Sequence, residues 1–200
     1  MQPVRTLVAL GLGTLATVAA VASPAVAQEP TYVPTTPGRH CVADVDNGTR
    51  SCFPTYREAI AFATQGRVTD APDDTRAAAH DKKLQERLSG PRGEHGLRLA
   101  KNSEAGVQAT TRLLGTIYSD KDFGGNSLSL VGSLGCVRYP EFGNLYDGWN
   151  DSISSTNSGQ CDVTLFQHAG FLGFSQTYRG AVPYVGDAMN DQASSISFDR

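Results

Sequence analysis

The sequence predicts a mainly β fold, in which two four-stranded Greek keys follow a small disulfide-linked hairpin and helices. Two observations in residues 108–200 lead to this fold class. The segment holds twelve of the sixteen aromatic residues, in short alternating runs separated by Gly, Asn, Asp and Ser. Such runs are typical of antiparallel strands around a core. Within the segment two sequence motifs each occur twice in the same order, as expected of a duplicated Greek key.

Size and charge exclude several classes of protein. The 200 residues suffice for one ordinary domain or two small ones, and only 18% of them are charged, which favours an exported β-rich protein. The net charge is −3, and the basic clusters are short. A nucleic-acid partner is therefore not expected.

Residues 1–27 are predicted to be a secretory signal peptide. Arg5 supplies the positive charge, residues 7–21 are apolar, and the small residues 25–27 offer a cleavage site. The apolar run is short and Pro24 follows it, which disfavours a membrane anchor. We expect a secreted, extracellular protein without membrane contact after the signal is cleaved.

All four cysteines lie beyond this cleavage site. An even number of cysteines in an exported chain predicts two disulfides, with three possible connectivities. Proximity in the sequence favours Cys41 with Cys52 and Cys136 with Cys161. A zinc site is discounted, because no two cysteines have the C-x2-C spacing.

Residues 28–68 are predicted to form a small appendage, a hairpin followed by a helix. A turn at 46–48 joins two short runs that a Cys41–Cys52 bridge would clamp. Thr55 and Glu58 then form a capping box that begins a helix. Residues 28–107 hold only four aromatic residues, so we expect this part of the chain to bury little surface.

A helical spacer and linker, 69–107, precedes the main domain. Its helix is predicted over 74–88, which is rich in alanine and charge. The main domain spans 108–200, with repeats at about 112–159 and 160–200. Its clearest predicted strands are 116–119, 127–131, 136–139, 163–167, 175–178 and 194–198.

The first repeated motif reads aromatic-x4-Phe-x-Gly-x-Ser. It occurs at 118–127 and again at 166–175, an offset of 48 residues. This spacing predicts a folded-over hairpin, in which two rings stack across the turn. The glycine then takes a backbone conformation that a Cβ would oppose.

The second repeated motif, Asn-Asp-x-x-Ser-Ser, occurs at 150–155 and 190–195. Asx and Ser side chains cap tight loops, and their oxygens with nearby carbonyls suit a hard cation. A single such hexapeptide is commonly only a turn without metal. Two copies, each following its own hairpin motif, point to a duplicated site.

With both motifs in place, the C-terminal half resembles the βγ-crystallin family, specifically its microbial calcium-binding branch. The resemblance implies a sandwich of two Greek keys with two Ca²⁺ sites. It also implies that a carbonyl from the other repeat's hairpin completes each loop, near 119–120 and 167–168.

The resemblance assigns roles to individual loop residues. In each loop a main-chain carbonyl, a side-chain oxygen and a hydroxyl are the implied metal ligands, at Asp151, Ser152, Ser154, Asp191, Gln192 and Ser194. The residues implied to brace the loops are Asn150, Ser155, Asn190 and Ser195. The third position of each loop is neutral here, so we expect modest affinity, on the order of 10⁻⁵ to 10⁻³ M. Calcium is then expected to stabilise the fold.

The sequence gives little support to an enzyme. The four histidines are scattered, and neither a G-x-S-x-G elbow, a P-loop nor a dinucleotide-binding motif is present. We therefore expect no catalytic residue and no cofactor other than calcium. The main hypothesis is a non-enzymatic calcium-binding protein.

Two other functions fit the resemblance. Exported bacterial proteins with this fold and two disulfides include metalloproteinase inhibitors, which makes an extracellular protease a possible partner. The connections 132–144 and 180–186 would then be the inhibitory loops. A toxin-like or antifungal module is the third hypothesis, and fold analogy does not decide among them.

Overall fold

The computed structural model describes residues 40–89, 111–136, 142–145 and 148–199. The chain divides into two units, 1–34 and 35–200, and all the described residues belong to the second. The predicted signal peptide and most of the predicted linker lie outside these residues. In the part that the structure describes, no helix has the length and apolarity to cross a membrane.

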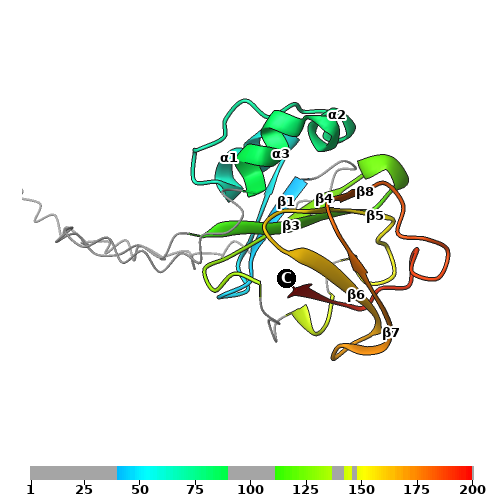
Figure 1. Cartoon of the computed structure of the whole chain (residues 1–200). Coiled ribbons are helices and arrows are strands. Elements are labelled where there is room, and N and C mark those ends of the chain that lie inside the picture. The colour runs from blue at the N-terminus through cyan, green and yellow to red at the C-terminus, as the bar shows by residue number, and fades with distance from the viewer. Residues whose placement is uncertain (1–39, 90–110, 137–141, 146–147, 200) are drawn as a thin grey trace, which may run out of the picture. The chain divides into compact units, whose positions relative to one another are not determined.

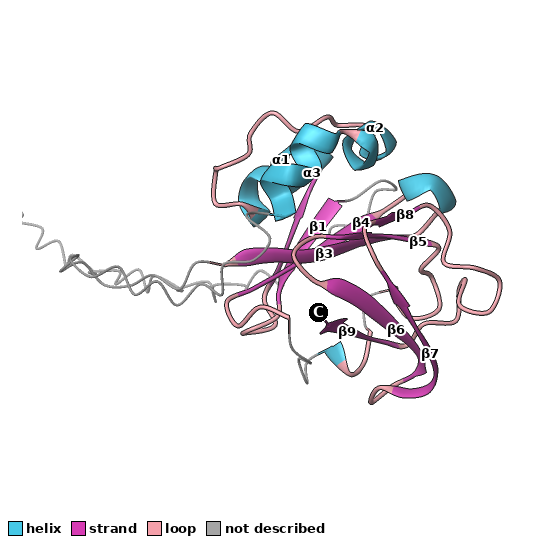
Figure 2. Cartoon of the chain, viewed as in Figure 1, coloured by secondary structure: helices cyan, strands magenta, loops and turns pink. Residues whose placement is uncertain are grey.

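Two β-sheets form this unit (Figures 1 and 2). The larger sheet has the strand order β2-β1-β4-β3-β5-β8, and the smaller has the order β7-β6-β9. In chain order the strands are β1 (His40–Asp44), β2 (Arg50–Phe53), β3 (Arg112–Tyr118), β4 (Ser127–Gly132), β5 (Ser155–Ser158), β6 (Asp162–His168), β7 (Leu172–Tyr178), β8 (Ala181–Val182) and β9 (Ser195–Asp199).

The strand pairing confirms the double Greek key. Strands β3, β4 and β5 come from the first repeat, and β6, β7 and β9 make the corresponding sheet of the second. Strand β8 belongs to the second repeat by sequence but pairs with β5 of the first. The two repeats are therefore joined by an exchanged strand. The predicted strand 136–139 lies largely outside the described residues.

The N-terminal hairpin is part of the larger sheet. Strands β1 and β2 pair antiparallel, and β1 also pairs with β4 in parallel, from His40 opposite Ser127 to Asp44 opposite Val131. From the sequence, this hairpin is expected to belong to a separate appendage. The structure instead places it inside the sheet, because a local sequence pattern carries no information on a parallel partner so far along the chain.

Three helices lie together on one face of the larger sheet (Figure 2). They are α1 (Tyr56–Ala63), α2 (Thr75–His80) and α3 (Lys82–Ser89). The predicted capping box begins α1, where the Thr55 side chain accepts a hydrogen bond from the backbone N–H of Glu58. The single helix predicted over 74–88 is divided at Asp81, whose side chain caps α3 by accepting from the N–H of Leu84 at 3.1 Å.

The larger sheet is therefore buried on both faces. Toward the smaller sheet lies a core that includes Ile117, Leu128 and Leu165. Toward the helices lies a second core, in which Tyr56 and Tyr118 are each at most 1% exposed. Each fully buried large side chain contributes about 1.5–3 kcal/mol. The expectation that residues 28–107 bury little is therefore wrong for the described part of that segment.

Two buried tyrosines link the helices to the first repeat. The hydroxyls of Tyr56 and Tyr118 lie 3.3 Å apart. Burial disfavours the charged phenolate, so it raises the pKa of both side chains, and that of Tyr118 well above its usual value. The pair stays neutral and acts as a polar contact within an apolar layer.

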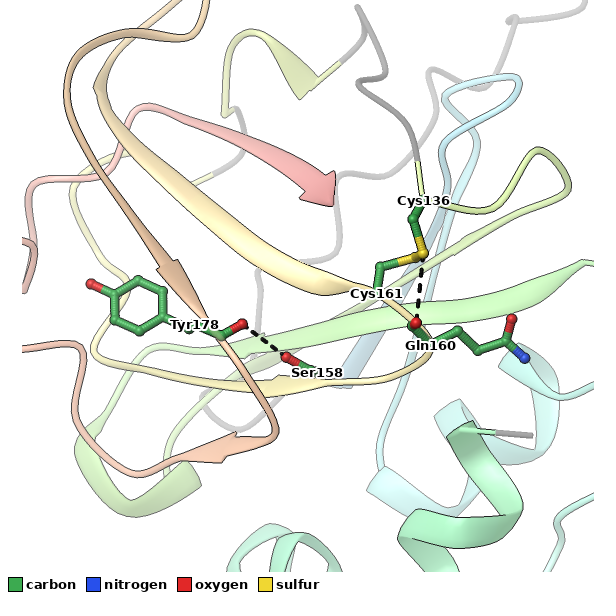
Figure 3. Close-up of a disulfide and its surroundings, with 5 residues drawn as sticks. All are labelled: Cys136, Ser158, Gln160, Cys161 and Tyr178. Carbon is green, nitrogen blue, oxygen red and sulfur yellow. Dashed lines mark hydrogen bonds between the residues drawn. A yellow bond between two sulfur atoms is a disulfide. The ribbon is translucent and has the colours of Figure 1, made fainter. Parts of the chain in front are cut away.

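Both predicted disulfides are present, Cys41–Cys52 and Cys136–Cys161. The first closes the β1–β2 hairpin between directly opposed residues. The second joins the segment after β4 to the residue before β6, and so ties the first repeat to the second (Figure 3). Beside it the Ser158 hydroxyl donates to the carbonyl of Tyr178 at 3.1 Å, which links β5 to β7.

We predict that acid weakens the attachment of the hairpin. The Nδ1 of His40 in β1 lies 2.9 Å from the hydroxyl of Ser127 in β4, and burial lowers the pKa of His40. The unfolded chain then binds more protons than the folded one below the ordinary value of 6.5. This contribution to stability is present above about pH 6.5 and is lost as the pH falls through that value.

Denaturant unfolding of the wild type and of His40→Gln, at several values between about pH 7.5 and pH 5, measures this effect. The free energy of unfolding should fall more steeply for the wild type. Equal pH dependence in the two proteins would contradict the prediction.

Candidate functional site

Both copies of the first motif form the same folded hairpin. The rings of Tyr118 and Phe123 lie 5.6 Å apart at 78°, and those of Phe166 and Phe171 lie 5.7 Å apart at 75°. Phe123 and Phe171 have φ values of 61° and 62°. This left-handed conformation is rare for a bulky side chain, so other contacts must hold it.

The motif glycines are required by the same fold. A Cβ on Gly125 would stand 2.2 Å from the Ser119 hydroxyl, and one on Gly173 would stand 2.6 Å from the His168 ring. Both glycines also have positive φ, 71° and 79°. Any other residue would be strained and would clash, as predicted from the sequence.

The last serine of each loop holds the left-handed phenylalanine. Ser155 Oγ accepts from the N–H of Phe123 at 3.0 Å and donates to the carbonyl of Asp120 at 2.6 Å. Ser195 Oγ makes the equivalent bonds to Phe171 and His168, at 3.1 and 2.7 Å. We call this pair of hydrogen bonds the serine clasp. It ties the last residue of each loop to the hairpin of its own repeat.

The two Asn-Asp-x-x-Ser-Ser loops lie side by side. The N–H of Asp151 donates to the carbonyl of Ala193 at 3.0 Å, and the N–H of Asp191 donates to the carbonyl of Ile153 at 3.2 Å. Both aspartates have φ near 55°, a conformation that Asp tolerates better than most residues. Each loop thus donates one backbone hydrogen bond to the other loop, at the equivalent position.

The first residue of each loop holds the aspartate that follows it. Asn150 Nδ2 donates to Asp151 Oδ2, and Asn190 Nδ2 donates to Asp191 Oδ2, both at 2.7 Å. The Oδ1 of Asn190 is buried and has no hydrogen-bond partner among the described residues. An unsatisfied buried oxygen is costly, and a cation is one way to satisfy it.

The implied ligands differ in their present contacts. The Ser152 hydroxyl donates to the carbonyl of Gly148 at 2.6 Å, and the Gln192 amide donates to the carbonyl of Asp191 at 2.9 Å. Within the described ranges, the hydroxyls of Ser154 and Ser194 make no hydrogen bond that would occupy them. These two hydroxyls are the best placed to accept a new partner.

The carbonyls expected to complete each metal site, near 119–120 and 167–168, already accept hydrogen bonds. The carbonyl of Asp120 accepts from Ser155, and that of His168 accepts from Ser195. Each is therefore bound by its own repeat, although a carbonyl has a second lone pair. The other repeat reaches each hairpin through the backbone, where Asp122 donates to Pro183 and Gly170 to Gly143.

Around both loops, the atoms that could bind a metal are oxygens of serine, amide and carbonyl groups. Among the described residues, no three His, Cys, Asp or Glu side chains gather in one place. Serine, amide and carbonyl oxygens fit a hard cation such as Ca²⁺ and not a soft metal. The residues present are therefore compatible with calcium. Because the loop side chains that would bind the ion are neutral, a modest affinity is expected.

The contact pattern of the loops could be predicted only in part. The serine and asparagine positions follow from the motif. The carbonyls of Ile153 and Ala193 have no sequence signal, because any residue supplies a carbonyl.

The connections proposed as inhibitory loops give no support to that function. The 180–186 connection is held to the body by the Tyr178 hydroxyl, which donates to the carbonyl of Val185 at 2.7 Å. Lys121 lies 3.8 Å from the ring centre of Tyr184 on the same connection. The 132–144 connection lies partly outside the described residues. A protease-inhibiting role is not favoured.

We predict that Ser155→Ala destabilises the fold by about 2–4 kcal/mol, because it leaves one donor and one acceptor without their partner. The matched control is Ser158→Ala in the same strand, which loses one hydrogen bond and should cost about 1 kcal/mol. Denaturant unfolding measures both. A loss for Ser155→Ala no larger than that of the control would contradict the serine clasp.

No family model and no curated protein matches the chain. Among solved structures, it is similar to a βγ-crystallin domain from Flavobacterium johnsoniae, at 27% identity over 42% of this chain and 92% of that one, with a TM-score of 0.32. A double mutant of a domain from Clostridium beijerinckii shares 26% identity over 42% and 94%, with a TM-score of 0.32.

The N-terminal domain of protein S shares 25% identity over 42% of this chain and 92% of that domain, with a TM-score of 0.34. Each match spans nearly a whole domain and less than half of this chain. Within this chain, the double Greek key is seen in the exchanged strand β8, the two folded hairpins and the two serine-braced loops. Residues 112–199 therefore form a double Greek key, the fold that the resemblance to the βγ-crystallin family implies.

Proposed function

We propose that this chain is an exported, non-enzymatic calcium-binding protein, in which calcium stabilises the βγ-crystallin fold. One observation carries the proposal. The two Asn-Asp-x-x-Ser-Ser loops lie side by side with equivalent backbone geometry and exchange hydrogen bonds at Asp151 and Asp191. Two equivalent sets of oxygens are thereby presented next to each other.

Each loop would hold one ion through the same positions. In the first loop these are the main-chain carbonyl of Asp151 and the hydroxyl of Ser154, and in the second the carbonyl of Asp191 and the hydroxyl of Ser194. The ion would supply positive charge that links these oxygens. The chain's own part is to hold them in place, through the left-handed aspartates and the serine clasps.

Side-chain charge sets the expected strength. Ser152 and Gln192 are neutral, and both are engaged in hydrogen bonds within their loops. Calcium affinity rises with the number of charged ligands, so we expect dissociation constants on the order of 10⁻⁵ to 10⁻³ M. At a free calcium concentration of about 100 times the dissociation constant, binding would stabilise the fold by about 2.7 kcal/mol.

Export is supported by the two disulfides, which form and persist in oxidising compartments. It is also supported by the charge and hydropathy pattern of residues 1–27. Calcium is the partner we assign, and the extracellular medium is where its concentration matches the expected affinity.

We predict that calcium raises the melting temperature of the purified protein and that a chelator reverses the rise. The physical reason is linkage, because the folded loops bind the ion and the unfolded chain does not. Differential scanning calorimetry with calcium and with chelator measures the effect. An unchanged melting temperature would sink the proposal.

We predict further that Ser154→Ala combined with Ser194→Ala weakens calcium binding about tenfold or more, since each site loses an oxygen that makes no other bond. Isothermal titration calorimetry measures stoichiometry and affinity together. The matched control is Ser133→Ala with Ser175→Ala, two serines outside the loops, which should keep the wild-type affinity. Equal affinity in both double variants would show that the loop hydroxyls are not ligands.

A further inference from the structure

Equivalent strands of the two repeats differ sharply in exposure. Strand β4 of the first repeat is buried at every position. Strand β7 of the second repeat is exposed at six of its seven positions, and only Tyr178 is buried. The first motif aligns these strands, with Ser127 equivalent to Ser175. The fold is the same in both repeats, so the difference lies in what covers each strand.

Two parts of the same chain cover β4, which are helix α1 against one face and strand β1 at its edge. Strand β1 runs beside β4 over five residue pairs, and β3 lies on the other side. Within the described residues, β7 has a neighbour on one side only, which is β6. The first repeat thus shows that this position in the fold accepts an added strand.

The free edge of β7, with the sequence Leu-Gly-Phe-Ser-Gln-Thr-Tyr, lacks the charges and the proline that protect many exposed edges. Its pairing with β6 is irregular between Leu172 and Ser175, so the regular part of the edge is Ser175–Tyr178. Leu172 is 64% exposed and Phe174 is 48% exposed. These are two of the four large hydrophobic side chains exposed in the described part of the chain.

We propose that the edge of β7 pairs with β7 of a second copy of this chain, antiparallel and related by a two-fold axis near Ser175. Two identical strands that pair by such an axis run antiparallel, and the contact closes on itself. The pairing would join two three-stranded sheets into one of six strands, and it would cover Leu172 and Phe174.

Charge favours a second copy as the occupant. The chain carries a net charge of −3, so most pairs of identical surfaces repel one another. Between Asp162 and Arg179 the sequence has no charged residue at neutral pH. Self-pairing at β7 therefore opposes no like charges, which directly opposed strands cannot tolerate.

The association should be reversible. Gln176 stands at the position of the buried Leu128 in the first repeat, so the edge remains compatible with water in the free monomer. A contact made by one strand pair is small and belongs with weak interfaces, roughly below 1,200 Å². We therefore expect a monomer–dimer equilibrium and not an obligate dimer.

Sedimentation velocity of the purified protein, from about 1 μM to about 1 mM, tests the proposal over the range of weak interfaces. The wild type should shift from monomer to dimer. Gln176→Lys and Gln176→Glu should each remain monomeric, because the two like charges would then lie diagonally across the axis, each one position from Ser175. An equimolar mixture of the two variants should recover the dimer.

Leu134→Lys is the matched control, since Leu134 is 72% exposed outside β7, and it should dimerise as the wild type does. Melting temperatures establish that each variant is folded. Measurement with calcium and with chelator separates this proposal from the proposed calcium sites. A wild type that stays monomeric throughout would overturn it, and so would a dimer that both Gln176 variants retain.

Discussion

A serine hydroxyl at the end of each loop holds a phenylalanine in a backbone conformation that it would not adopt alone. Positive φ at a bulky residue costs roughly 1–3 kcal/mol. The clasps made by Ser155 and Ser195 offset this cost, because each satisfies one backbone donor and one backbone carbonyl. The folded hairpin, its stacked rings and its glycine all depend on that turn. The loop that would bind calcium and the hairpin that shapes the sandwich are therefore one cooperative unit.

The loop and hairpin of one repeat are in turn joined to those of the other repeat. The loops exchange backbone hydrogen bonds at Asp151 and Asp191, strand β8 crosses from one repeat to the sheet of the other, and the Cys136–Cys161 bridge spans them. An ion held in either loop would therefore stabilise both repeats. With this coupling, neutral and weak ligands would be sufficient for the stabilising role that we propose.

The sequence was sufficient to predict the features that depend on residues close together in the chain. The hairpin motif, the Gly125 and Gly173 positions, the capping box at Thr55 and both disulfide pairings follow from residue types at short spacing, and the structure confirms them. The role of the N-terminal half did not follow. Its helices have a thin apolar face that matches a sheet surface formed by residues far along the chain. Such a match is visible only when both surfaces are known.

Strand β1 lies between β2 and β4. Strand β4 therefore pairs with a segment that is synthesised long before it. A disulfide within the hairpin spans only eleven residues and closes a short loop, whereas the β1–β4 pairing must wait until Ser127 has been synthesised. Contacts between such distant segments form slowly. A preformed hairpin, closed by its disulfide, would then serve as the template on which the first repeat assembles, and synthesis from the N-terminus supplies the two parts in that order.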